Sequence, residues 1–138
     1  MIWDDILTLL AVAVLADDRI RDLELVEFCH EAQSLNQHFD PDRILSRSSL
    51  RKWFDDKHLP IKIALSSGDR ALFISDSLER IDDVAMRPHI LQSIFGIIVC
   101  DYEMHDEESK FIQTAVDIWD MGSKALIGTP PNGARSKP

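Results

Sequence analysis

Hydrophobic side chains cover nearly the whole circumference of the first segment, residues 2–16, when it is drawn as a helix. This pattern predicts a helix that is packed on several sides and central to the core. A second segment of the same kind begins at Pro88 and runs to residue 99, and proline suits the first turn of a helix. We therefore expect two buried helices, one in each half of the chain.

Amphipathic patterns fill much of the remaining chain. In residues 23–36 the apolar positions recur at helical spacing, and the acidic side chains lie largely opposite them. This arrangement is typical of a helix with one buried face and one face in water. Apolar positions at the same spacing predict further helices at residues 69–81 and 107–120.

Prolines suggest the boundaries in the middle of the chain. Asp40-Pro41 predicts an N-cap with proline in the first turn, which opens a helix that reaches residue 54. His58-Leu59-Pro60 predicts a boundary before a short helix that begins at Ile61 and ends at Ser67-Gly68. No segment shows the alternating pattern of a β-sheet. We therefore expect an all-α fold, a compact bundle of about seven helices.

Length and composition are those of one folded domain with a short tail. A chain of 138 residues with 45% hydrophobic residues can bury one substantial core without disulfides. Residues 1–121 carry the helical patterns, whereas residues 122–138 are rich in glycine, proline and serine. We expect a single domain over residues 1–121 and a flexible tail over residues 122–138.

The net charge of the chain limits the classes of partner that it can bind. It carries 24 acidic residues against 15 lysines and arginines, for a formal net charge of -9. Nucleic acid and anionic lipid surfaces would be repelled, so neither is an expected partner. Divalent cations and basic protein surfaces are the better electrostatic partners, and the sequence leaves the oligomeric state open.

The location follows from the apolar run and the cysteines. Residues 6–16 are too few to span a bilayer, and acidic rather than basic residues precede them, unlike in a secretory signal. Cys29 and Cys100 are not in a Cys-x-x-Cys motif, which suits small buried residues in a reducing compartment. We expect a cytoplasmic protein with no transmembrane segment.

A short acidic segment occurs twice, each time after an apolar helix and before an amphipathic one. Residues 16–24 read Ala-Asp-Asp-Arg-Ile-Arg-Asp-Leu-Glu, and residues 100–108 read Cys-Asp-Tyr-Glu-Met-His-Asp-Glu-Glu. Three acids recur in the same order in both copies. The pattern predicts an internal helix-loop-helix repeat. Its paired acids are Asp17 with Asp101, Asp22 with Asp106, and Glu24 with Glu108.

Four of these acids have an ordinary structural explanation. Asp22 and Asp106 fall where an N-cap is expected, and an Asp cap contributes about 0.5–2 kcal/mol. Glu24 and Glu108 fall in the first turn, where a carboxylate interacts favourably with the helix dipole. These four positions require no ligand.

Asp17 and Asp101 differ, because they follow the C-terminal ends of the apolar helices, where the dipole disfavours a carboxylate. Either each carboxylate accepts backbone N–H groups of its own loop, or a divalent cation of the Mg²⁺ or Ca²⁺ type binds there. The spacing is not that of an EF-hand, because the twelfth position from Asp17 is Phe28.

The two repeats resemble the Ala-Asp-Gly-x-Ile-x-x-x-Glu signature of the TerB-like tellurite-resistance family, which the membrane-anchored DjlA-type co-chaperones share. The resemblance implies a compact helical fold with neighbouring loops and an acidic surface that binds metal ions. It also implies a role in bacterial stress response without an established catalytic activity. Asp18 and Tyr102 occupy the glycine position of the signature. The signature acids correspond to Asp17, Glu24, Asp101 and Glu108.

Two alternative functions are open. Glu27 and His30 have the Glu-x-x-His spacing of helical metalloproteins, and with His105 they could serve a metal-dependent enzyme; a surface pair is the simpler explanation. Trp3 and Trp119, near the two ends of the predicted domain, could instead mediate self-association of a structural subunit, or simply belong to the core.

No phosphate-binding loop or hydrolase motif is present. We therefore expect a non-enzymatic TerB-like module that binds a divalent cation or a basic protein partner through an acidic surface. Its six candidate ligands are Asp17, Asp22, Glu24, Asp101, Asp106 and Glu108.

Overall fold

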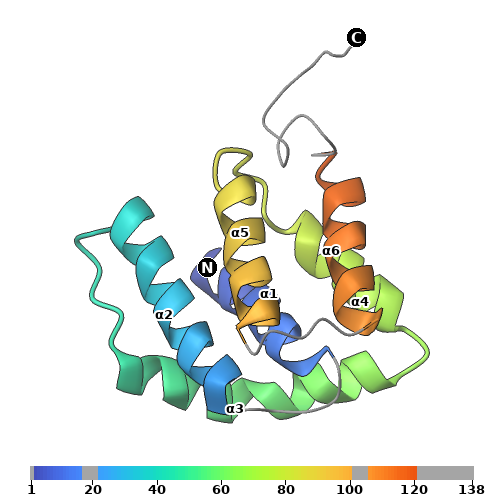
Figure 1. The fold of residues 1–138 in the computed structure, drawn as a ribbon, viewed down its shortest axis with the longest axis horizontal. Helices are drawn as coiled ribbons and strands as arrows, with labels where there is room; N and C mark the ends of the chain where they lie inside the picture. The colour runs from blue at the N-terminus through green and yellow to red at the C-terminus, as the bar shows by residue number, and fades with distance from the viewer. Residues whose placement is uncertain (1, 17–21, 101–105, 121–138) are drawn as a thin grey trace, which may run out of the picture.

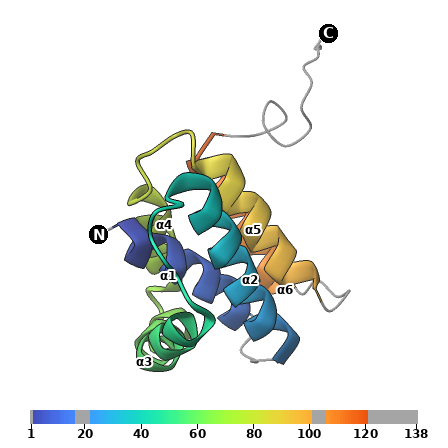
Figure 2. The ribbon, with the colours of Figure 1, turned by 90° about the vertical axis from the view of Figure 1, so that its left-hand side faces the viewer.

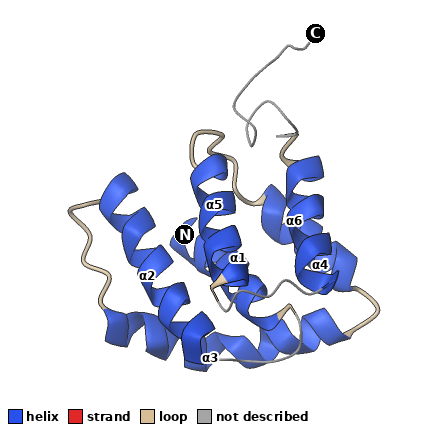
Figure 3. Cartoon of the chain, viewed as in Figure 1, coloured by secondary structure: helices blue, strands red, loops and turns tan. Residues whose placement is uncertain are grey.

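The fold was analysed in a computed structural model, which describes residues 2–16, 22–100 and 106–120. These residues form helices joined by short connections, and none of them lies in a β-strand (Figure 3). The all-α class predicted from the sequence is therefore confirmed. The helices are α1 (Ile2–Leu15), α2 (Asp22–Phe39), α3 (Arg47–Ser66), α4 (Arg70–Glu79), α5 (Arg87–Val99) and α6 (Asp106–Ile118).

The first helix is the centre of the molecule. Helix α1 contacts α2, α3, α4 and α5, and every residue from Leu9 to Val14 is completely buried. Helix α3 runs across the other helices along one side of the bundle (Figure 1), and Figure 2 shows it nearly end-on. An apolar helix that is packed on several sides is what the sequence of residues 2–16 predicts.

The prediction of about seven helices is wrong for the middle of the described chain. The two helices expected on either side of Pro60 are one helix, α3, with the proline inside it. Pro60 removes the hydrogen bond that its N–H would give to the carbonyl of Asp56, but both residues are exposed, so water can reach that carbonyl. Ile61 and Leu65 are buried beyond the proline and keep that half of α3 on the core.

The predicted start of this helix at Asp40-Pro41 is also wrong. Residues 40–46 form a connection, and α3 begins at Arg47. The N-cap is Ser46, whose side-chain oxygen accepts a hydrogen bond from the backbone N–H of Ser49 at 3.1 Å. Ser46 therefore marks the start of the helix.

Both terminal tryptophans lie inside the bundle. Trp3 and Trp119 are each 5% exposed, and the indole N–H of Trp119 donates to the carbonyl of Leu78 at 2.9 Å. Their rings therefore belong to the core rather than to an outer face. Of the helices described, none is both long and apolar enough to cross a membrane.

Candidate functional site

The two acidic repeats are described only in part. Residues 17–21 and 101–105 lie outside the described chain, and with them Asp17, Asp101 and His105. The other predicted ligands belong to the helices that follow the loops. Asp22 and Asp106 are the first residues of α2 and α6, and both are exposed.

Glu24 and Glu108 occupy equivalent and unusual positions. Their side chains are 0% and 1% exposed, although each stands in the first turn of its helix. Charged side chains are rarely this buried unless they are paired, and both glutamates do interact with other groups of the protein. The matching burial shows that the first turns of α2 and α6 are built alike.

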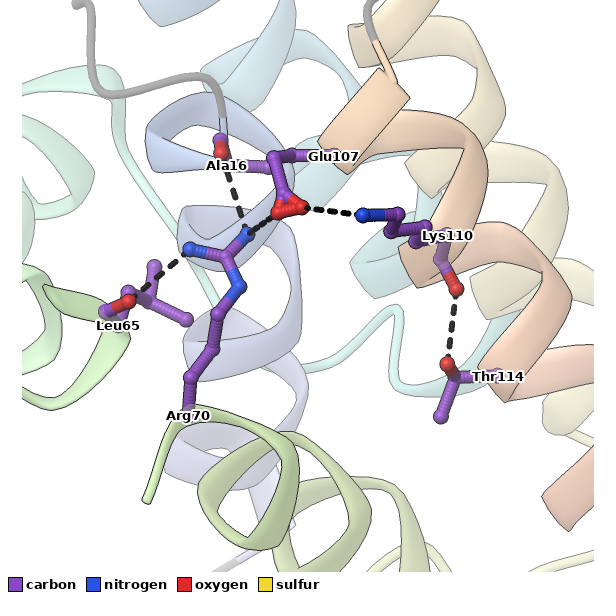
Figure 4. A network of polar contacts seen from close by, with 6 residues as sticks. All are labelled: Ala16, Leu65, Arg70, Glu107, Lys110 and Thr114. Carbon is purple, nitrogen blue, oxygen red and sulfur yellow. Dashed lines mark hydrogen bonds and ion pairs between the residues drawn. The ribbon is translucent and has the colours of Figure 1, made fainter. Parts of the chain in front are cut away.

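Arg70, at the start of α4, links the two repeats (Figure 4). Its Nη2 donates to the carbonyl of Ala16 at 3.1 Å, and its Nη1 donates to the carbonyl of Leu65 at 3.0 Å. Carbonyl groups at the end of an α-helix have no partner within the helix, so the guanidinium satisfies one at the end of α1 and one at the end of α3. Nη2 also lies 3.8 Å from Oε2 of Glu107 in α6, and Glu107 in turn pairs with Lys110 at 3.3 Å.

The Arg70 network contacts residues beside both acidic loops. Ala16 directly precedes residues 17–21, and Glu107 follows residues 101–105 by one position. One guanidinium therefore joins the beginning of the first loop to the end of the second (Figure 4). The flanks of the two acidic loops lie on the same side of the molecule.

A second cluster lies on the outer part of α2. Glu27, His30 and Glu31 each offer one ligand atom, and these atoms all lie within 4.8 Å of one another. Residues three and four positions apart share one face of a helix, which brings the three side chains together. The sequence points to Glu27 and His30, and the structure adds Glu31 to them, whereas His105 lies outside the described residues.

Helix α5 closes this cluster on one side. A Cβ atom at Gly96 would lie 2.8 Å from Oε2 of Glu31 and 3.8 Å from Oε2 of Glu27, so the missing side chain leaves room for the carboxyl group. Ser93, which is 4% exposed, makes a side-chain hydrogen bond to Glu31. The carboxyl group of Glu31 is thus held against the surface of α5.

The pKa of Glu31 reflects this confinement. Burial is the largest cause, and together with the hydrogen bond to Glu27 and the negative charge of Glu27 it raises the pKa of Glu31 from the usual 4.5 to about 7. The hydrogen bond from Ser93 opposes the rise. Near neutral pH, Glu31 is therefore about half protonated, and its carboxyl group shares that proton with Glu27.

The cluster opens into a cavity between α2 and α5, which we call the α2–α5 groove. Its volume is about 500 Å³, and at its other end the rings of His38 and His89 stack with their centroids 4.7 Å apart. Histidine, glutamate, serine and glutamine supply its polar lining, without any lysine or arginine from the described helices. The groove thus offers several metal-ligating groups, and none of its described lining residues is a lysine or an arginine.

Two signals in the sequence could have indicated this site. Glu27 and Glu31 form an i,i+4 pair of like charges, which is unfavourable on an isolated helix. Gly96 interrupts an otherwise apolar helix, and an isolated glycine in such a place often marks close packing. That the two features face each other depends on how α2 packs against α5.

The chain was also compared with known proteins. No model of a known family, no characterised protein and no solved structure matches it. Its function is therefore inferred from the site geometry and the repeated acidic segment.

Proposed function

We propose that the chain is a non-enzymatic, TerB-like helical module of the bacterial cytoplasm, active in tellurite resistance or a related stress response. It binds a divalent cation of the Mg²⁺ or Ca²⁺ type, or a basic protein surface, through its two acidic loops. The observation that carries this proposal is the bridge from Ala16 through Arg70 to Glu107, because it brings the flanks of both loops together.

The burial of the first-turn glutamates distinguishes the two versions of the proposal. Only exposed carboxylates such as Asp22 and Asp106 can face a docked protein, whereas Glu24 and Glu108 are inside. An ion seated between the loops can draw on both kinds of carboxylate, since Ca²⁺ takes six to eight oxygen ligands and Mg²⁺ six. The cation version therefore gives a role to more of the repeated acidic residues than the protein-partner version does.

Calorimetric titration with Mg²⁺ and with Ca²⁺ tests the cation version. We expect saturable heat with the natural sequence and its loss when Asp17→Asn and Asp101→Asn are combined. Glu79→Gln is the matched control, because Glu79 is an exposed acid of α4 outside the repeats. An absence of saturable heat at millimolar ion, together with an unchanged melting temperature, would exclude the cation version and leave the basic protein partner.

A further inference from the structure

We propose that Glu27, His30 and Glu31 form a second cation site, separate from the loops, which takes a transition metal ion of the Zn²⁺ class. The site lies at one end of the α2–α5 groove. Neither the repeated acidic segment nor the proposed function requires it, so the two proposals can succeed or fail independently.

The donor set determines the kind of ion. Mg²⁺ and Ca²⁺ prefer oxygen ligands, whereas a histidine nitrogen together with carboxylates suits Zn²⁺ and neighbouring transition metals. Glu27, His30 and Glu31 supply one nitrogen and two carboxylates. This composition separates the site chemically from the all-carboxylate loops.

The distances are close to those that such an ion needs. Bonds of about 2.1 Å in a tetrahedral site place ligand atoms about 3.4 Å apart. The candidate ligand atoms already lie within 4.8 Å of one another, so rotations of the three side chains by roughly an ångström would complete the set. Glutamate and histidine side chains on a helix surface can move this far without a change in the backbone.

The site has support from a neighbouring helix. Ser93 is buried behind Glu31 and makes a hydrogen bond to it, and a hydrogen bond of this kind orients a ligating carboxylate. Gly96 provides the space that the same carboxyl group occupies. A surface pair of acids on an isolated helix would have neither feature.

The electrostatics of the groove favour a bound cation. No lysine or arginine in the described ranges forms an ion pair with Glu27 or Glu31. Two neighbouring carboxylates repel each other when both are ionised, and a divalent ion would remove that repulsion. His30 is exposed at the mouth of the groove, so the ion has a route from solvent and a free position for water.

Titration with Co²⁺, followed by its visible absorption, tests this proposal on the full chain, with Zn²⁺ as competitor. We expect one Co²⁺ ion per chain and displacement of the absorption by Zn²⁺. His30→Asn and Glu31→Gln should each weaken Co²⁺ binding by about tenfold or more, because each removes a ligand. Both changes are expected to leave the protein folded, since His30 is exposed and Glu31→Gln removes a confined charge.

The controls separate this site from the loops and from the rest of the groove. Glu79→Gln matches Glu31→Gln in chemistry but changes an exposed acid of α4, and it should bind Co²⁺ as the natural sequence does. The combined Asp17→Asn and Asp101→Asn variant should keep the Co²⁺ absorption even where it loses the heat of Mg²⁺ or Ca²⁺ binding. Absence of a saturable Co²⁺ signal, or a signal that survives His30→Asn and Glu31→Gln, would overturn the proposal.

Discussion

Replacement of Gly96 by alanine tests the packing of α2 on α5 and the proposed metal site together. The new methyl group would lie 2.8 Å from Oε2 and 3.3 Å from Cδ of Glu31. Non-bonded carbon and oxygen atoms settle at about 3.5 Å or more, so the carboxyl group has to move by at least about half an ångström. Because it is the far end of a flexible side chain at the edge of a groove, it can rotate toward solvent.

The expected change in the free energy of unfolding is the balance of two effects. Alanine in a helix interior is favoured over glycine by about 1 kcal/mol. The displaced carboxyl group loses its hydrogen bond with Ser93, worth about 0.5–1.5 kcal/mol, but it regains hydration that confinement had removed. At pH 8, where Glu31 is largely ionised, we expect Gly96→Ala to be more stable than the natural sequence by about 0.5 kcal/mol.

Urea unfolding at pH 8 measures this balance, and Co²⁺ titration of the same variant reports on the site. Gly68→Ala is the matched control, because a Cβ atom at Gly68 meets nothing within 4 Å and should leave Co²⁺ binding unchanged. We expect Gly96→Ala to be more stable by the same small amount, about 0.5 kcal/mol, and to bind Co²⁺ more weakly. Destabilisation by more than about 2 kcal/mol, or unchanged affinity for Co²⁺, would refute the reasoning.

Three further outcomes are expected. Because folding raises the pKa of Glu31 from 4.5 to about 7, the folded state holds this proton more tightly than the unfolded state, so the natural sequence should lose stability between about pH 4.5 and 7. The upper limit of that loss is about 3.4 kcal/mol, and screening by water at this partly exposed side chain makes it smaller. Urea unfolding at pH 4.5 and pH 8 should show the loss in the natural sequence and not in Glu31→Gln. Arg70→Met should lower the free energy of unfolding by about 2–3 kcal/mol, since it leaves two helix-end carbonyls without their donor; a change below 0.5 kcal/mol in denaturant titrations would count against that role. Pro60→Ala should raise the melting temperature, because alanine restores a backbone hydrogen bond in α3 and is far better tolerated inside a helix, and a lower melting temperature would contradict this.

The spacing of apolar residues predicts most of the helices correctly. The predictions are wrong where a local signal, such as a proline, conflicts with tertiary packing. The burial of α1 follows from its apolar circumference, and Pro88 lies in the first turn of α5 as predicted. The sequence predicts a helix boundary at Pro60 because proline weakens helices. In the structure, buried residues on both sides of Pro60 pack on the core, and α3 continues through it. Tertiary contacts that lie far apart in the chain decided this case, and no short window of sequence contains them.

For the candidate sites, too, some features could be predicted from the sequence and others depend on tertiary packing. Repetition alone identified the acidic segments, and the structure adds that Glu24 and Glu108 are buried alike. The significance of Glu31 could not be read from the sequence, because its environment comes from Ser93 and Gly96 on another helix. Spacing along one helix predicts which side chains are neighbours, whereas confinement depends on the helix that packs against them.

The contacts of Arg70 have a consequence for how the protein unfolds. Its side chain contacts the residue that follows α1, the last turn of α3 and the first turn of α6. Separation of α6 would therefore remove one contact of the guanidinium that also binds the carbonyl of Ala16. Because Arg70 joins the residue after α1 to the first turn of α6, we expect these two helix ends to open together, as parts of one cooperative unit.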